Sequence, residues 1–328
     1  MTGPMQTKFF QNASVLVTGG TGFVGRHIVN ELLPAGASIR IPVNRRKVEF
    51  DHQGIETVQA DLMVRADCLR VAKGIDYIFH AAGSVGAAGV SANAAMDSIT
   101  GNLVMTSQML QSAWTAGVQR FLLFSSSSVY PAADHAVKEE EGWDGEPHES
   151  YFGYGWMRRY LEKLALYVSP QSGMQIAVVR PTAVYGRHDN FDPATCHVIP
   201  ALVRKAVERM HPYEVWGDGS EVRDFLHVSD LARGCLLMLE KYASCDPVNI
   251  GYGKGASVKD ILPIILRAAG YSDATVVFNA SRPTMIPFRM VNTLKAKRLL
   301  GFEPEVSLEE GLSDTVRWFS SDRGVRSI

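Results

Sequence analysis

Two groups of side chains in this sequence have the types and spacing needed for proton transfer. The first is a run of four hydroxyls, Ser125–Ser128, placed directly after the apolar stretch 121–124. The second is Tyr154 with Arg158 four residues later, a spacing that puts both on one helix face, where a guanidinium would stabilise a phenolate. Lys163 falls on the opposite side of that helix and does not substitute for Arg158. Turn chemistry is an alternative account of the serine run.

A third group, rich in glycine, is typical of nucleotide binding. An apolar strand over 15–17 leads directly into Gly19, Gly22 and Gly25, and a helical pattern follows. Glycines so placed permit a tight bend, a close approach to a pyrophosphate and close helix–strand packing, with the phosphates at the helix N-terminus. A flexible loop is the alternative, but the order strand, turn, helix favours dinucleotide binding. The predicted contacts are Gly19, Thr21, Gly22, Phe23, Val24 and Gly25.

The residues after the second strand, 38–43, indicate which dinucleotide to expect. An NAD site usually places Asp or Glu there for the ribose hydroxyls. This chain instead has Asn44, Arg45, Arg46 and Lys47, which are suited to a 2′-phosphate. The sequence therefore predicts NADP(H) rather than NAD(H), with a solvated basic loop as the alternative.

Two later strand ends add candidate cofactor contacts. Asp61 either contacts the adenine or caps the helix that follows. Ala81, Ala82 and Gly83 either let the chain pass close to the cofactor or form a tight turn. His80, at the end of the preceding strand, is expected to satisfy a hydrogen bond there rather than to act in catalysis.

These side chains need a framework of alternating strands and helices. The expected strands are 15–17, 38–43, 55–60, 75–80, 121–124, 175–181 and 248–250. Helical patterns separate them, including a long one beginning at Asn102 and one that carries Tyr154, while the acidic segment 139–141 is expected to be a solvated loop. The predicted fold is α/β, a Rossmann-like doubly wound parallel sheet with a smaller C-terminal α/β substrate domain.

The pattern also predicts where the two domains divide. The dinucleotide-binding domain is expected over 12–181, with return segments at about 222–250. The substrate domain is expected over 182–221 and 251–320, as a lid over the carboxyl edge of the sheet.

Composition narrows the class of protein. The chain has 328 residues, 46% of them hydrophobic, and a formal net charge of -1, which gives no reason to expect nucleic acid or a membrane as partner. The four cysteines are scattered without metal or disulfide spacing. No apolar run approaches ~20 residues, and residues 1–11 lack the apolar region of a signal peptide. A soluble, cytoplasmic protein without a bound metal is expected.

The landmarks together resemble the extended short-chain dehydrogenase/reductase family of nucleotide-sugar epimerases, dehydratases and reductases. They run along nearly the whole chain, from the glycine turn through Ser126 and Tyr154 to Arg180-Pro181 and Arg223-Asp224-Phe225. Within the family, the segments 188–193 and 197–202 are similar to the GDP-L-fucose synthase-like branch, which acts with NADPH on GDP-linked 4-keto-6-deoxy sugars.

The resemblance implies a role for each matching residue. Ser126 and Tyr154 would polarise the sugar carbonyl or alkoxide, with Tyr154 as acid and base, and His197 would donate a proton for epimerisation. Trp216 would face the base and Arg223 the diphosphate. The implied substrate contacts are Ser127, Ser128, Val198, Trp216, Arg223 and Arg289. The further implied cofactor contacts are Leu62, Tyr154, Arg158, Pro181 and His197.

Four departures from the family pattern redirect the functional prediction. Arg158 stands where the family has a catalytic lysine and presents a planar fork in place of a compact ammonium. Ser128, retained as a candidate catalytic residue, replaces the cysteine that pairs with histidine in double epimerisation, and serine is a poorer base. Ala183 replaces an asparagine, and the segment 282–287 differs from its acidic, glycine-containing counterpart.

Ketoreduction, single epimerisation through His197 and 4-epimerisation by transient oxidation therefore all remain open. Dehydration is disfavoured, because serines occupy the places of the dehydratases' Asp-Glu pair. The alternative is a cofactor-binding or regulatory protein that has lost catalysis, suggested by Arg158. Trp156, Met157 and Leu161 are expected to pack, in a helix bundle between two subunits of a homodimer as in the family.

Overall fold

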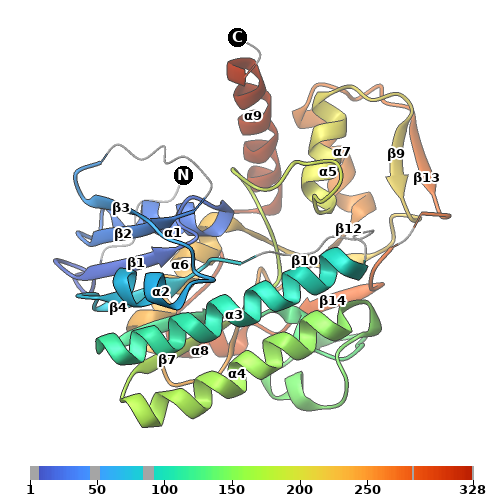
Figure 1. Cartoon of the computed structure of the whole chain (residues 1–328). Coiled ribbons are helices and arrows are strands. Elements are labelled where there is room, and N and C mark those ends of the chain that lie inside the picture. Colours follow the sequence, from blue (N-terminus) through green and yellow to red (C-terminus); the bar gives the residue numbers. More distant parts are fainter. Residues whose placement is uncertain (1–6, 45–51, 84–91, 283, 327–328) are drawn as a thin grey trace.

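The main feature of the computed structural model is a seven-stranded parallel sheet (Figure 1). The structure describes residues 7–44, 52–83, 92–282 and 284–326. In spatial order the strands are β3 (Ile55–Gln59), β2 (Ser38–Val43), β1 (Ser14–Thr18), β4 (Tyr77–His80), β5 (Arg120–Phe124), β7 (Gln175–Pro181) and β11 (Val248–Ile250). The strand order reverses between β1 and β4, so the predicted doubly wound fold is confirmed.

Helices cover both faces of this sheet. One face carries α1 (Phe23–Leu32), α6 (Val228–Lys241) and α8 (Leu294–Leu300). The other carries α2 (Arg65–Ala72), α3 (Ala92–Ala116) and α4 (Phe152–Ser172), with α3 and α4 side by side (Figure 1). The central strands β1, β4, β5 and β7 are largely apolar because both of their faces are buried, whereas most residues of the edge strand β3 are exposed.

A second, smaller part, built mostly from residues after β7, has a core of its own. A five-stranded sheet has the order β12 (Gly255–Ser257), β10 (Val222–His227), β14 (Phe288–Val291) and β6 (Ala136–Val137), with β8 (Ala183–Tyr185) also paired to β10. Two parallel strands, β9 (Tyr213–Trp216) and β13 (Val276–Asn279), lie near α5 (Val198–Val207) and α7 (Val258–Ala268) (Figure 1). The last helix, α9 (Leu308–Arg326), packs on α5 and α7. The predicted domain boundaries remain a prediction.

Two local expectations are wrong. The helix expected to begin at Asn102 is already helical at Ala92, because alanine-rich residues extend it beyond the apolar pattern. The acidic segment is a 3₁₀ helix, η2 (Glu139–Trp143), and the Glu139 side chain is buried. Its carboxylate accepts the Asn249 backbone N–H at 2.9 Å, and a buried N–H needs such an acceptor. None of the helices described above is both long and apolar enough to cross a membrane.

Candidate active site

The glycine turn after β1 lies against the end of β4. Gly19 has φ +67°, and a Cβ there would lie 2.7 Å from the carbonyl oxygen of Ala81 and from the nitrogen of Ala82. A Cβ on Gly25 would lie 2.2 Å from the carbonyl oxygen of Gly19. The N-cap of α1 is Gly22, which has no side chain that could accept a hydrogen bond from the first N–H groups of the helix. This cradle fits a dinucleotide's phosphates.

The small residues after β4 are held in place by a buried histidine. The Ala82 N–H donates to Thr18 Oγ1 at 3.1 Å, and that oxygen lies 2.8 Å from His80 Nδ1. His80 Nε2 lies 3.1 Å from Thr106 Oγ1. Burial, with a smaller contribution from the Arg158 charge, lowers the pKa of His80 to about 3. The expectation that His80 satisfies strand-end hydrogen bonds is confirmed.

The adenosine end of the predicted site is described in part. Asn44 is exposed, and its carbonyl accepts a hydrogen bond from Gln59 at 3.0 Å. Arg45, Arg46 and Lys47 lie outside the described residues. The remaining contacts predicted near this end and along the strand ends are Thr21, Phe23 and Val24 at the start of α1, buried Leu62, exposed Gly83 and half-buried Pro181.

Asp61 has a role that the sequence did not indicate. Its carboxylate accepts the Met63 N–H at 2.9 Å, inside the turn before α2, whereas the N-cap of α2 is Val64. The helix-capping interpretation is therefore wrong, because the chain makes a further turn between Asp61 and α2. Contact with the adenine remains a prediction.

Tyr154 and Arg158 meet as their spacing predicts. Arg158 Nη2 donates to the Tyr154 phenol oxygen at 2.5 Å, and Nη1 donates to the Phe124 carbonyl at 2.8 Å. Arg158 is 9% exposed and Tyr154 is half-buried, so the hydrogen bond between them is partly shielded from water. Lys163 is exposed over the Trp143 ring, 4.2 Å from its centroid, which confirms that it does not substitute for Arg158.

The serine run forms the short helix η1 (Ser127–Val129), which packs against α4. Ser126 Oγ accepts the Ser128 N–H at 3.1 Å and so caps η1. The Ser128 hydroxyl is buried and has no hydrogen-bond partner within the described part of the chain. A Cβ on Gly155 would lie 2.5 Å from the Ser128 carbonyl oxygen, so the first turn of α4 rests directly on η1. The predicted serines therefore lie against the first turns of the helix that carries Tyr154.

His197 comes from a different element, the N-cap position of α5. It is exposed, yet desolvation by the surrounding protein lowers the pKa of its imidazole below the usual value. Burial raises the pKa of the neighbouring Cys196 thiol, which argues against an ionised dyad. Val198, the first residue of α5, is also exposed. These features leave His197 neutral and accessible at pH 7.

Two arginines form a cationic pair on adjacent strands. Arg223 on β10 is the register partner of Arg289 on β14. Arg289 is 6% exposed and donates from Nη2 to the Tyr130 carbonyl at 3.2 Å, but its Nε and Nη1 have no partner among the residues described. Burial, and to a lesser extent the Arg223 charge, lowers the pKa of Arg289 to about 10. Burial likewise lowers the pKa of Arg223. Such a pair favours a bound anion.

Trp216 ends β9 and is 40% exposed. The Arg282 guanidinium lies 5.4 Å from the centroid of the Trp216 ring. The indole thus offers a flat surface for stacking beside the turn that leads to Arg223.

A buried polar network beneath the site was missed in the sequence. Arg180 donates to Glu162 from Nε at 2.8 Å and from Nη2 at 2.7 Å. Its Nη1 donates to the Tyr130 phenol oxygen at 3.0 Å, and that phenol donates to Asn249 at 2.6 Å. Glu162 also accepts a hydrogen bond from Ser125. The available signal was the spacing of Tyr154, Arg158 and Glu162, which places all three on one face of α4.

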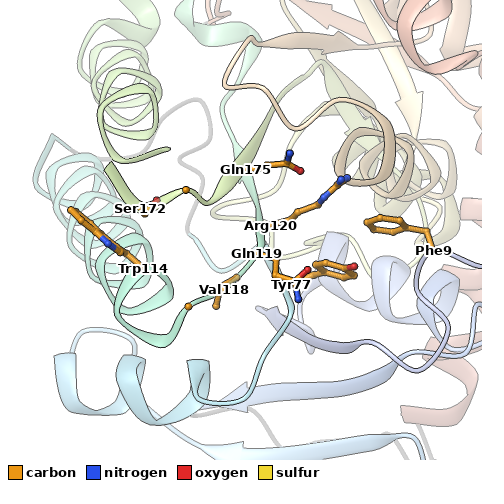
Figure 2. Close-up of a pocket in the computed structure, with 10 residues that line it drawn as sticks. Phe9, Tyr77, Trp114, Val118, Gln119, Arg120, Ser172 and Gln175 are labelled. Carbon is orange, nitrogen blue, oxygen red and sulfur yellow. The ribbon is translucent and has the colours of Figure 1, made fainter. Parts of the chain in front are cut away.

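A cavity of about 390 Å³ lies elsewhere (Figure 2). Its walls include Phe9, Tyr77 and Arg120 on one side and Trp114 on the other, with Ser172 and Gln175 beside them. Tyr77, Arg120 and Gln175 begin their strands, whereas the predicted site lies where strands end. The cavity is therefore at the opposite edge of the sheet, and none of the predicted site residues that the structure describes lines it.

The fold and the glycine cradle define a dinucleotide-binding α/β protein, and comparison with known proteins identifies its family. The NAD dependent epimerase/dehydratase family matches residues 15–251. The chain belongs to this family, as its resemblance to the extended short-chain dehydrogenases/reductases predicted.

Relatives along almost the whole chain include a putative GDP-L-fucose synthase 2 of Arabidopsis thaliana, 29% identical over 94% of this chain and 92% of that protein. A dTDP-4-dehydro-6-deoxy-D-allose reductase of a Streptomyces species is 30% identical over 93% of this chain and 96% of the relative. Among solved structures, a UDP-glucose 4-epimerase of Thermotoga maritima with UDP-glucose is similar with TM-score 0.85 and 26% identity, covering 94% of this chain and 99% of that one.

Proposed function

We propose that this protein is an NADP(H)-dependent epimerase or ketoreductase of a nucleotide-linked 4-keto or 4-hydroxy hexose. The observation that carries the proposal is the Arg158–Tyr154 hydrogen bond, 2.5 Å long, on a helix packed against the serine turn at the end of β5. A phenol held by a permanent cation next to the hydroxyls of the serine turn is suited to move a proton at a sugar oxygen. A protein that only binds cofactor has no need of that arrangement.

In this proposal each side chain acts on a stated atom. Tyr154 holds or takes the proton at its phenol oxygen, and Arg158 stabilises the phenolate. Ser126 donates a hydrogen bond to the sugar oxygen, which polarises the carbonyl. His197, neutral and accessible, exchanges a proton with a sugar carbon during epimerisation. The cofactor, when bound, supplies or accepts a hydride.

The cofactor contacts proposed for this chain begin at the glycine cradle. The turn from Gly19 to Gly25 holds the diphosphate, and Ala81 and Ala82 pass beside it. The preference for NADP(H) over NAD(H) rests on the cations that follow β2. Comparing KM for NADPH and NADH in the wild type and in an Arg45→Ala/Arg46→Ala variant tests it. The variant is expected to raise KM for NADPH at least about tenfold, because charge-assisted bonds to the 2′-phosphate are lost.

The arginine pair supports a nucleoside diphosphate sugar as substrate. Arg289 has two buried N–H-bearing nitrogens without a described partner, and Arg223 lies next to it on the neighbouring strand. The segments 182–221 and 251–320, as the substrate domain, would then hold the nucleotide, with Trp216 stacked on its base. Ser127, Ser128 and Val198 would line the sugar. We favour a GDP-linked sugar, because segments 188–193 and 197–202 are similar to the GDP-L-fucose synthase-like branch.

The direct test is turnover of a sugar nucleotide. Purified protein is incubated with NADPH and GDP-4-keto-6-deoxy-mannose, with the dTDP- and UDP-linked 4-keto sugars in parallel. We expect loss of the nicotinamide absorbance of NADPH for a ketoreductase, or a new sugar by NMR for an epimerase. If none of these substrates reacts but an Arg158→Lys variant becomes active, the protein is a cofactor-binding member of the family that lacks catalysis.

We further propose that the protein is a homodimer. The outward face of α4 carries large exposed side chains at helical spacing: Phe152, Trp156, Tyr160 and Tyr167. The predicted packing residues Met157 and Leu161 instead lie in the core of the same chain. A row of exposed aromatic residues on one helix is typical of a protein–protein contact.

A further inference from the structure

Side chains of α4 hold two consecutive residues at the end of β5. Arg158 donates to the Phe124 carbonyl at 2.8 Å, and Glu162, one turn further along, accepts a hydrogen bond from the Ser125 hydroxyl. Both side chains lie on the helix face that carries Tyr154. The strand end that leads into Ser126 is therefore attached to the same helix as the phenol.

The acceptor of the Ser125 bond is itself rigidly held. Glu162 and Arg180 are 4% and 0% exposed, and two hydrogen bonds of 2.8 and 2.7 Å join them. Arg180 is bonded in turn to the Glu139 carbonyl at 2.7 Å. A carboxylate with both oxygens engaged cannot rotate freely, so the position of Ser125 follows that of α4.

The side chains of Ser125 and Ser126 point to opposite sides and have different roles. Successive side chains in extended backbone point to opposite sides, so when Ser125 faces Glu162, Ser126 faces away from it. Ser125 is 3% exposed, whereas Ser126 is half-buried and caps η1. Ser125 is thus withdrawn from any substrate, and its hydroxyl serves the alignment of its neighbour.

We propose that Ser125 and Glu162 are positioning residues that set the Ser126 hydroxyl in register with the Tyr154 phenol. The inference rests on the proposed function, in which Ser126 and Tyr154 act on one sugar oxygen. Two groups acting on one atom must be aligned closely, and a misplacement of about 1 Å costs up to about a hundredfold in rate.

The test is Ser125→Ala, which removes the hydroxyl without adding volume. We expect kcat to fall about tenfold while KM for the sugar nucleotide stays within about twofold, because the diphosphate contacts on β10 and β14 are untouched. The matched control is Ser169→Ala, which deletes a hydroxyl bonded to the Met174 carbonyl at 2.7 Å, near the far end of α4. This control is expected to keep kcat even where it lowers Tm by a similar amount.

A second measurement works without substrate. Hydrogen exchange of the free proteins, read on peptides covering 124–131, is expected to be faster in Ser125→Ala and unchanged in Ser169→Ala. Wild-type kcat in Ser125→Ala, or equal exchange in both variants, overturns the positioning role. A wild type that turns over no sugar nucleotide, combined with faster exchange in Ser125→Ala, refutes the proposed function and leaves the alignment role standing.

Discussion

Arg158 shows how one side chain can serve both chemistry and architecture. Its two terminal nitrogens bond the Tyr154 phenol and the Phe124 carbonyl. A guanidinium offers this fork in a fixed plane and keeps its proton at any accessible pH, whereas a lysine offers a single point charge that can be neutralised. Arg158 therefore supplies a cation beside the phenol and a hydrogen bond to the last residue of β5.

Arg158→Met tests the contribution of the charge. The variant keeps an apolar stem but removes both hydrogen bonds, so we expect kcat to fall about a hundredfold, because the phenol has lost the cation beside it. Steady-state kinetics at saturating substrate measure the effect. Lys163→Met, on the exposed side of the same helix, is the control and should behave as wild type. Equal activity in the two variants would show that Arg158 has no role in the mechanism.

The lowered pKa of the buried His80 predicts how the stability of the protein depends on pH. Its pKa is about 3 in the fold and 6.5 in the unfolded chain, so below pH 6.5 the unfolded state binds the extra proton. The free energy of unfolding should therefore fall as the pH drops from 6.5 towards 3, by at most about 1.4 kcal/mol per pH unit from this group. His27, lowered to about 4, acts with the same sign, whereas Asp224, raised to about 6, opposes it in the window 3.8–6.

Urea unfolding at pH 7 and pH 5 measures this dependence. Between pH 7 and pH 5, the unfolding free energy of His80→Gln should fall less than that of the wild type, although it is already lower at pH 7. His52→Gln, at an exposed position, is the control and should keep the wild-type difference. An equal change in unfolding free energy between the two pH values in all three proteins would contradict the role of His80 in the pH dependence.

At the scale of elements, α1 and the turn before it require glycine where their backbone segments come into close contact. Gly25→Ala would place a Cβ 2.2 Å from the Gly19 carbonyl oxygen, so the backbone must shift. We expect a loss of about 1–3 kcal/mol in unfolding free energy and at least a tenfold rise in the Kd for NADPH. Thermal melts and a cofactor titration check the two effects.

The matched control is another helical glycine. Gly101 lies in α3, and a Cβ there would meet nothing within 4 Å. Gly101→Ala should therefore raise the unfolding free energy by about 0.5–1 kcal/mol and leave cofactor affinity unchanged. If Gly25→Ala binds NADPH as tightly as this control does, the cradle is not the phosphate site.

At the scale of the whole molecule, the exposed face of α4 predicts assembly. Phe152 and Tyr160 are 52% and 55% exposed two turns apart. We expect the wild type to sediment as a dimer and Phe152→Glu/Tyr160→Glu to sediment as a monomer, because burying two carboxylates in an apolar interface is unfavourable. Leu294→Glu, at another exposed apolar position, should remain dimeric. A monomeric wild type refutes the assembly proposal.

The elements themselves were predictable to different degrees. Strands such as β1 and β7 were found because fully buried parallel strands are continuous apolar runs. The strand β14 and the helix α8 were missed, because each is short and its apolar residues are interrupted by lysine or arginine. The burial of Glu139 was also missed, since its reason lies in the backbone N–H of Asn249, 110 residues further along the chain.

The sequence by itself determined the alternating sheet, the glycine turn and the pairing of Tyr154 with Arg158, because each depends on residues close together in the chain. Only the tertiary structure decided which distant groups meet. Arg223 and Arg289 become neighbours through strand pairing, and Ser125, Glu162 and Arg180 join beneath the site. Periodicity reports the face on which a side chain lies, but not the partner that lies across from it.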